Sequence, residues 1–133
     1  MLARVADTKA WLAKAAGDIK AAEILGAVTA LGGAAVFHRQ QAAEKAMKGF
    51  LAWHDVPFRK THDLEEIGEA CIAIDSKFKE IVDHTIPLTQ YAWKYRYPGE
   101  PRGPTQEEVE VALTLAHEVY DAIAASLPEE VKP

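Results

Sequence analysis

The chain has 133 residues, 49% of them hydrophobic, which predicts a single domain over residues 1–133. The formal net charge of -5 excludes a global basic field that attracts nucleic acid regardless of sequence, so any polyanion site is expected to be local. A lone cysteine, Cys71, excludes an internal disulfide, and the longest uncharged stretch, residues 24–37, is shorter than the ~20 residues of a membrane span. We therefore predict a cytoplasmic protein without a membrane segment.

The first predicted helix covers residues 3–27. Apolar residues recur there at steps of three and four, which is the spacing of one helix face. The charged residues Lys9, Lys14, Asp18 and Lys20 fall between the apolar positions, so we assign them to the solvated side.

The second predicted helix covers residues 34–54. Gly32 and Gly33 separate it from the first, because paired glycines favour turns over helix. Pro57 stops it, because proline has no N–H to continue the hydrogen-bond ladder.

Two helices are predicted next, over residues 63–75 and 77–96. Asp63 is expected to accept the first free amide hydrogens of the earlier one, with Glu66 favoured by the positive end of its dipole. Within the later one, Pro87 removes an amide donor, which predicts a kink or a break.

The last predicted helix covers residues 105–127 and follows a proline- and glycine-rich loop at 97–104. Thr105 and Glu108 have the spacing of a capping box. No segment alternates apolar and polar residues as a strand does. The sequence therefore predicts an all-α fold, an up-and-down bundle of four to five helices.

Polar groups of several kinds line the second predicted helix. His38, Gln41 and Lys45 are three and four residues apart, so they lie on one side and could hold a phosphate or a partner's carboxylate. The alternative interpretation is a solvated helix face, on which Glu44 and Lys48 form an exposed ion pair.

A second polar cluster begins at His62. Together with Asp63, Glu65 and Glu66 it offers metal-ligand side chains, but His62 has no histidine partner at helical zinc-site spacing. Helix capping accounts for Asp63, so no metal site is predicted.

Aromatic and cationic residues alternate before Pro98. Such residues could stack bases and neutralise phosphates, or they could be core rings with cations at a helix end. The members are Tyr91, Trp93, Lys94, Tyr95, Arg96 and Tyr97.

In this order, the clusters resemble the HEPN family (higher eukaryotes and prokaryotes nucleotide-binding). Residues 37–48 match its Phe-His-x-Gln-Gln-Ala-Ala-Glu-Lys-Ala-x-Lys helix, residues 61–64 its Thr-His-Asp-Leu helix start, and residues 96–98 its Arg-Tyr-Pro. The first helix, rich in alanine and acidic residues, fits as well, so the resemblance covers nearly the whole chain.

The resemblance implies a stand-alone prokaryotic helical bundle, usually a homodimer, that associates with nucleotides or RNA. It also implies a minimal nucleotidyltransferase as partner, in a toxin–antitoxin-like pair. Ribonucleases of the family use an arginine and, a few residues later, a histidine at the start of the last helix. Here no histidine follows Arg96 before His117, so this catalytic pair is missing.

Three functions are therefore considered. The first is a non-catalytic module that binds nucleotide or RNA, or acts with a nucleotidyltransferase, and that needs neither metal nor cofactor. The second is a metal-independent ribonuclease toxin, and the third a purely structural dimeric helix bundle. For the first, the proposed ligand-binding residues are His38, Gln41, Lys45, Arg96 and Tyr97.

Overall fold

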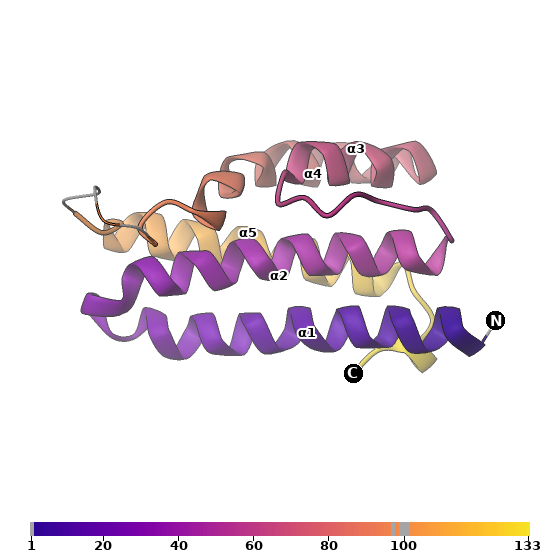
Figure 1. Ribbon diagram of the computed structural model, residues 1–133, viewed down its shortest axis with the longest axis horizontal. Helices are drawn as coiled ribbons and strands as arrows, with labels where there is room; N and C mark the ends of the chain where they lie inside the picture. The colour runs from indigo at the N-terminus through magenta and orange to yellow at the C-terminus, as the bar shows by residue number, and fades with distance from the viewer. Residues whose placement is uncertain (1, 97, 99–101) are drawn as a thin grey trace.

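The computed structural model describes residues 2–96, 98 and 102–133, and within them it is an all-α bundle without strands, as predicted. Its α-helices are α1 (Leu2–Gly26), α2 (Gly32–Trp53), α3 (Leu64–Ile74), α4 (Lys79–Thr85) and α5 (Gln106–Ala125) (Figure 1). Short 3-10 helices are η1 (Thr29–Leu31), η2 (Ser76–Phe78), η3 (Ile86–Ala92) and η4 (Glu129–Val131).

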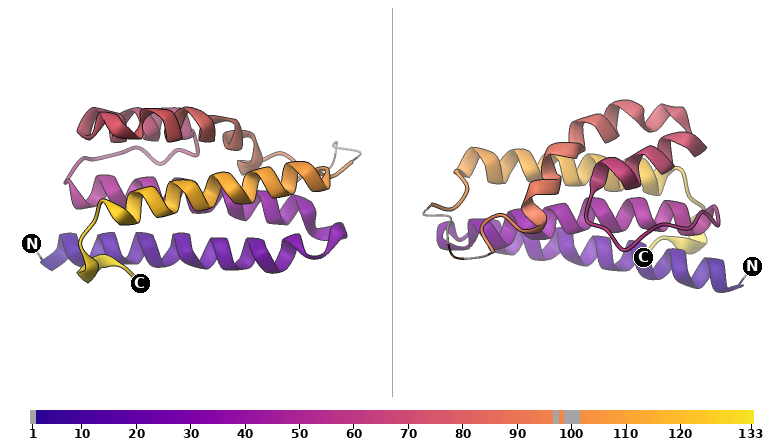
Figure 2. Two further views of the ribbon diagram at one scale, coloured as in Figure 1. Left: turned by 180° about the vertical axis from the view of Figure 1, so that it is seen from behind. Right: turned by 45° about the horizontal axis from the view of Figure 1, so that its top comes forward.

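The three long helices lie along the long axis of the molecule, and α2 is in the middle. α1 covers one side of α2, α3 and α4 lie on the opposite side, and α5 lies behind it in Figure 1. After α2, residues 54–63 return alongside it, so α3 runs in the same direction as α2 (Figure 2). None of the helices in the described ranges combines the length and apolarity needed to cross a lipid bilayer.

The core surrounds α2. Its largest fully buried apolar side chains come from α1, α2, α3, η3, α5 and η4; they are Leu12, Val36, Met47, Phe50, Leu51, Leu64, Ile67, Leu88, Val119 and Val131. Cys71 belongs to this core with no exposed surface, and burial raises the pKa of its thiol to about 12. The thiol is therefore un-ionised apolar filling.

The start of α5 has the predicted capping box. The Thr105 hydroxyl accepts the Glu108 N–H at 3.1 Å, and the Glu108 carboxylate accepts the Thr105 N–H at 3.3 Å. This pair of bonds fixes the direction in which α5 leaves the loop.

The start of α3 is capped by Asp63, whose carboxylate accepts the N–H of Glu65 at 3.0 Å. Glu66 has a different partner from the one expected. It accepts a hydrogen bond from Arg59 Nε at 3.1 Å, and this bond lowers the pKa of the Glu66 carboxyl. Glu66 therefore ties the connection before α3 to the helix itself.

The segment predicted as one helix over 77–96 is divided. α4 ends at Thr85 and the chain continues as η3, with Pro87 near its start, so the break expected at this proline is confirmed. The predicted end at residue 96 was wrong, because residues 93–96 form turns and Tyr95 has a left-handed φ of 68°. These turns bring the chain back over the start of α2.

Candidate functional site

Most polar side chains of α2 are buried. They are Arg39, Gln40, Gln41, Glu44 and Lys48. Glu44 is 3% exposed and Lys48 6%, so the interpretation of this pair as an exposed one on a solvated face was wrong. The reason is that α1, α3, η3 and α5 pack around α2 and leave it almost no solvated side.

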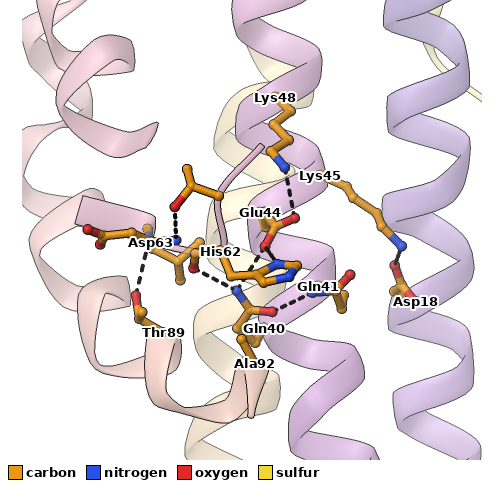
Figure 3. A network of polar contacts seen from close by, with 12 residues as sticks. Asp18, Gln40, Gln41, Glu44, Lys45, Lys48, His62, Asp63, Thr89 and Ala92 are labelled. Carbon is orange, nitrogen blue, oxygen red and sulfur yellow. Dashed lines mark hydrogen bonds and ion pairs between the residues drawn. The ribbon is translucent and has the colours of Figure 1, made fainter. Parts of the chain in front are cut away.

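The Glu44 carboxylate is the centre of a hydrogen-bond network (Figure 3). It accepts from Lys48 Nζ at 3.0 Å, from Gln40 Nε2 at 3.1 Å and from His62 Nδ1 at 2.8 Å. The Gln40 amide also donates to the backbone carbonyl of His62 at 3.2 Å. The network thus fastens the connection before α3 to the middle of α2.

A second carboxylate, that of Asp18 in α1, contacts two of the predicted ligand-binding residues. His38 Nδ1 lies 2.8 Å from Asp18 Oδ1, and Lys45 Nζ lies 2.7 Å from Oδ2. Because a carboxylate only accepts, Nδ1 carries the proton in this contact and Nε2 is left for another partner. His38 and Lys45 are partly exposed, whereas Asp18 is only 8% exposed.

Asp18 was not among the predicted ligand-binding residues, because its position between the apolar steps of the first helix predicts a solvated side chain. A signal for it exists: Asp18 is three residues after Ala15 and four before Ala22, and both alanines are fully buried. A carboxylate at core spacing indicates a buried cationic or hydrogen-bonding partner.

An open groove of about 510 Å³ lies beside this cluster. Its lining consists of Ala10, Ala13, Lys14, Gly17, Asp18 and Lys45. The small residues of α1 keep it hollow; a Cβ at Gly17 would meet no atom within 4 Å. Two ammonium groups and one carboxylate border the groove, which leaves one excess positive charge for an anionic ligand.

For Gln41 and Arg96 the structure gives partners other than Asp18. Gln41 turns its amide to Gln40 Oε1 at 2.7 Å and so joins the Glu44 network. The Arg96 guanidinium lies 4.4 Å from the centroid of the Phe37 ring, and it donates to the Ala92 carbonyl at 2.7 Å. Tyr97 lies outside the described residues.

The aromatic segment contains both core rings and an exposed ring. Tyr91 and Tyr95 stack with centroids 6.1 Å apart, and both hydroxyls donate to the Glu108 carboxylate, at 3.2 and 3.4 Å. Burial, assisted by the negative charge of Glu108, raises the pKa of Tyr91 to about 12. Trp93, in contrast, is 52% exposed.

Comparison with known proteins gives one family. A model described as HEPN domain matches residues 8–127, nearly the whole chain. No curated protein and no solved structure matches the sequence. The family expected from the residues of α2 and the segments at 61–64 and 96–98 is therefore confirmed.

Proposed function

The chain belongs to the HEPN family, whose domain indicates a function related to nucleotides or RNA, and on that premise we propose that it binds a phosphate-bearing ligand without cleaving it. The observation that carries the proposal is the meeting of His38 and Lys45 at Asp18, beside an open groove that Lys14 also lines.

Each proposed contact has a chemical reason. Lys45 and Lys14 supply point charges for phosphate oxygens, and Nε2 of His38 adds a hydrogen-bond partner. Arg96 lies against Phe37, the residue before His38, and a guanidinium can grip a phosphate with two parallel hydrogen bonds. Gln41 and Tyr97 complete the proposed set, because an amide can bond a phosphate oxygen and a tyrosine ring is a side chain on which a base can stack.

The non-catalytic part of the proposal rests on the last helix. The histidine that follows Arg96 is His117, well inside α5, and its Nε2 lies 3.2 Å from Glu23 of α1. A general acid or base must come within hydrogen-bond reach of the reacting group. His117 is thus engaged at the α1–α5 contact, away from the start of α5 where family ribonucleases have their histidine.

Binding is tested with fluorescently labelled ATP and a labelled single-stranded RNA of twelve nucleotides, by anisotropy at fixed salt. Replacing Arg96 by Ala removes a charge-assisted contact, so affinity should fall more than about tenfold. The control Lys132→Ala, at a lysine paired with Glu129, should leave affinity unchanged. Equal binding by Arg96→Ala and the unmodified protein would show that the proposed site is wrong.

Asp18→Asn provides a test of opposite sign. The amide keeps the shape of the side chain but removes the negative charge next to His38 and Lys45, so affinity for ATP should rise severalfold. The gain should shrink as salt is added, because an exposed phosphate is screened. An unchanged or weaker affinity would place the phosphate somewhere other than the Asp18 cluster.

A metal-independent ribonuclease is the second candidate function. The observation in its favour is that His38 and His62 each direct Nδ1 to a buried carboxylate, an arrangement that orients an imidazole for proton transfer. The assay is cleavage of a labelled RNA in the presence of a chelator. If the unmodified protein cleaves the RNA and His38→Ala or His62→Ala does not, the ribonuclease function replaces the non-catalytic proposal.

We also propose a homodimer and a minimal nucleotidyltransferase as partner. The half-exposed indole of Trp93 supports a contact at the η3 end of the molecule, because aromatic side chains are enriched in the interfaces between protein chains. Light scattering at micromolar concentration should give the mass of a dimer.

Co-purification with a nucleotidyltransferase encoded beside the gene tests the proposed partner. A dimer that binds no nucleotide, RNA or nucleotidyltransferase would instead be a purely structural bundle.

A further inference from the structure

A second and larger groove lies on another face of the molecule, between α4 and α5. Its volume is about 720 Å³, within the range of ligand sites. Its apolar lining includes Ile81 of α4 and Ala122 and Ala125 of α5. Both alanines stop at Cβ and therefore leave room between the two helices for the larger side chains of another molecule.

The rim of this groove is acidic. Glu80 of α4 and Glu118 and Asp121 of α5 border it, and none of these three carboxylates makes a hydrogen bond or ion pair with another described residue. The basic residues of the lining are His84 and Lys77, and the Lys77 ammonium is already 3.3 Å from Asp75. The groove thus has a negative potential, opposite in sign to the groove beside Lys45, and it disfavours phosphate.

The shape of the groove favours a helix over an extended peptide. Two helices form its walls, and a third helix can place a ridge of side chains between them. An extended peptide that binds by strand addition needs a free strand edge, and the described residues contain no strand. Because acidic residues lie on both walls, a helix bound between them needs cationic side chains on both of its flanks.

We propose that the α4–α5 groove binds a basic amphipathic helix of a partner protein. Large apolar side chains of the guest, at helical steps of three and four, lie over Ala122 and Ala125. Its lysines or arginines pair with Glu80 on one wall and with Glu118 and Asp121 on the other. This surface works independently of the phosphate site, so either proposal can fail without the other.

The probe is a fluorescein-labelled 18-residue peptide with leucines on one helical face and lysines on the others, titrated with the full chain. Saturable binding is expected. Glu118→Lys combined with Asp121→Lys should weaken it at least about tenfold, because two attractions become repulsions. Ala125→Phe, at an exposed position, should weaken it similarly by filling the groove without entering the core.

Two controls separate the groove from general charge attraction. Glu65→Lys combined with Glu69→Lys makes the same change in net charge on exposed positions of α3 and should leave affinity within about twofold. A peptide of identical composition with its leucines scattered should bind at least about tenfold more weakly. Equal loss in the α3 variant, or equal binding of the scattered peptide, would overturn the proposal. Binding of spermine at Glu118 and Asp121 without binding of the peptide would also overturn the proposal.

Discussion

Replacing Glu44 by Gln should destabilise the fold strongly although the side chain hardly changes in size. The carboxylate accepts from Gln40, Lys48 and His62, and an amide can satisfy some of these donors but cannot balance the ammonium of Lys48. Both side chains of the ion pair are more than nine-tenths buried, so solvent screens the loss very little. Removing one partner of a buried pair costs about 3–5 kcal/mol.

The lower end of that range is the better expectation. Lys48 Nζ also lies 5.6 Å from the ring of Trp11 and 5.7 Å from that of Phe58, and these rings retain some stabilisation of the cation. A loss of about 3 kcal/mol is a large part of a typical unfolding free energy of about 5–15 kcal/mol. It should lower the thermal midpoint by roughly 10 °C.

The assay is urea unfolding followed by circular dichroism, with Lys48→Met as the second arm of a double-mutant cycle. Methionine keeps the packing against Trp11 and Phe58 and removes the uncompensated charge, so it should restore much of the stability of Glu44→Gln. Asp83→Asn breaks the pair with Lys79, which has the same helical spacing but is exposed, and should not shift the midpoint measurably. A loss below about 1 kcal/mol in Glu44→Gln would refute the view that this ion pair is buried.

Other expectations concern single residues. Gly17→Ala, on an open helix surface, should raise the unfolding free energy by about 0.5–1 kcal/mol, whereas Gly68→Ala should lower it by about 1–3 kcal/mol, because the new Cβ overlaps Val82 Cγ1. Val82→Ala added to Gly68→Ala should recover part of that loss in the same urea assay. The contribution of Tyr91 to the unfolding free energy should hold up to pH about 10 and be lost between about 10 and 12, because the folded state raises the pKa of Tyr91 from 10.0 to about 12 and therefore resists its ionisation. Absorbance titration checks this, and Tyr91→Phe should flatten the fall. The thiol of Cys71 should react with a thiol reagent at pH 8 only after unfolding; rapid reaction in the folded protein would contradict its burial.

Local features of the fold could be predicted because their partners are near in sequence. Thr105 and Glu108 are one turn apart, and the break at Pro87 follows from the missing N–H of a single residue. The end of the segment after Pro87 could not be placed in this way. The left-handed turn at Tyr95 depends on contacts with Glu108 and with the start of α2, which helical periodicity does not report.

The candidate site was only partly predictable for the same reason. Spacing places His38 and Lys45 on one side of α2, but their common partner Asp18 is 20 and 27 residues away. The periodicity of one helix assumes one buried face. α2 has neighbours on several sides, so polar positions such as Glu44 and Lys48, which that assumption assigns to water, are buried.

The central position of α2 also affects how the chain tolerates change. From residue 39 to residue 51, every residue except Lys45 is buried. On an ordinary amphipathic helix about half of the positions accept almost any side chain, because they face solvent. A saturation mutagenesis library scored for folded protein should therefore find α1 permissive along its exposed side and α2 intolerant at nearly every position. The Lys45 codon should be the one place in that stretch where polar replacements survive.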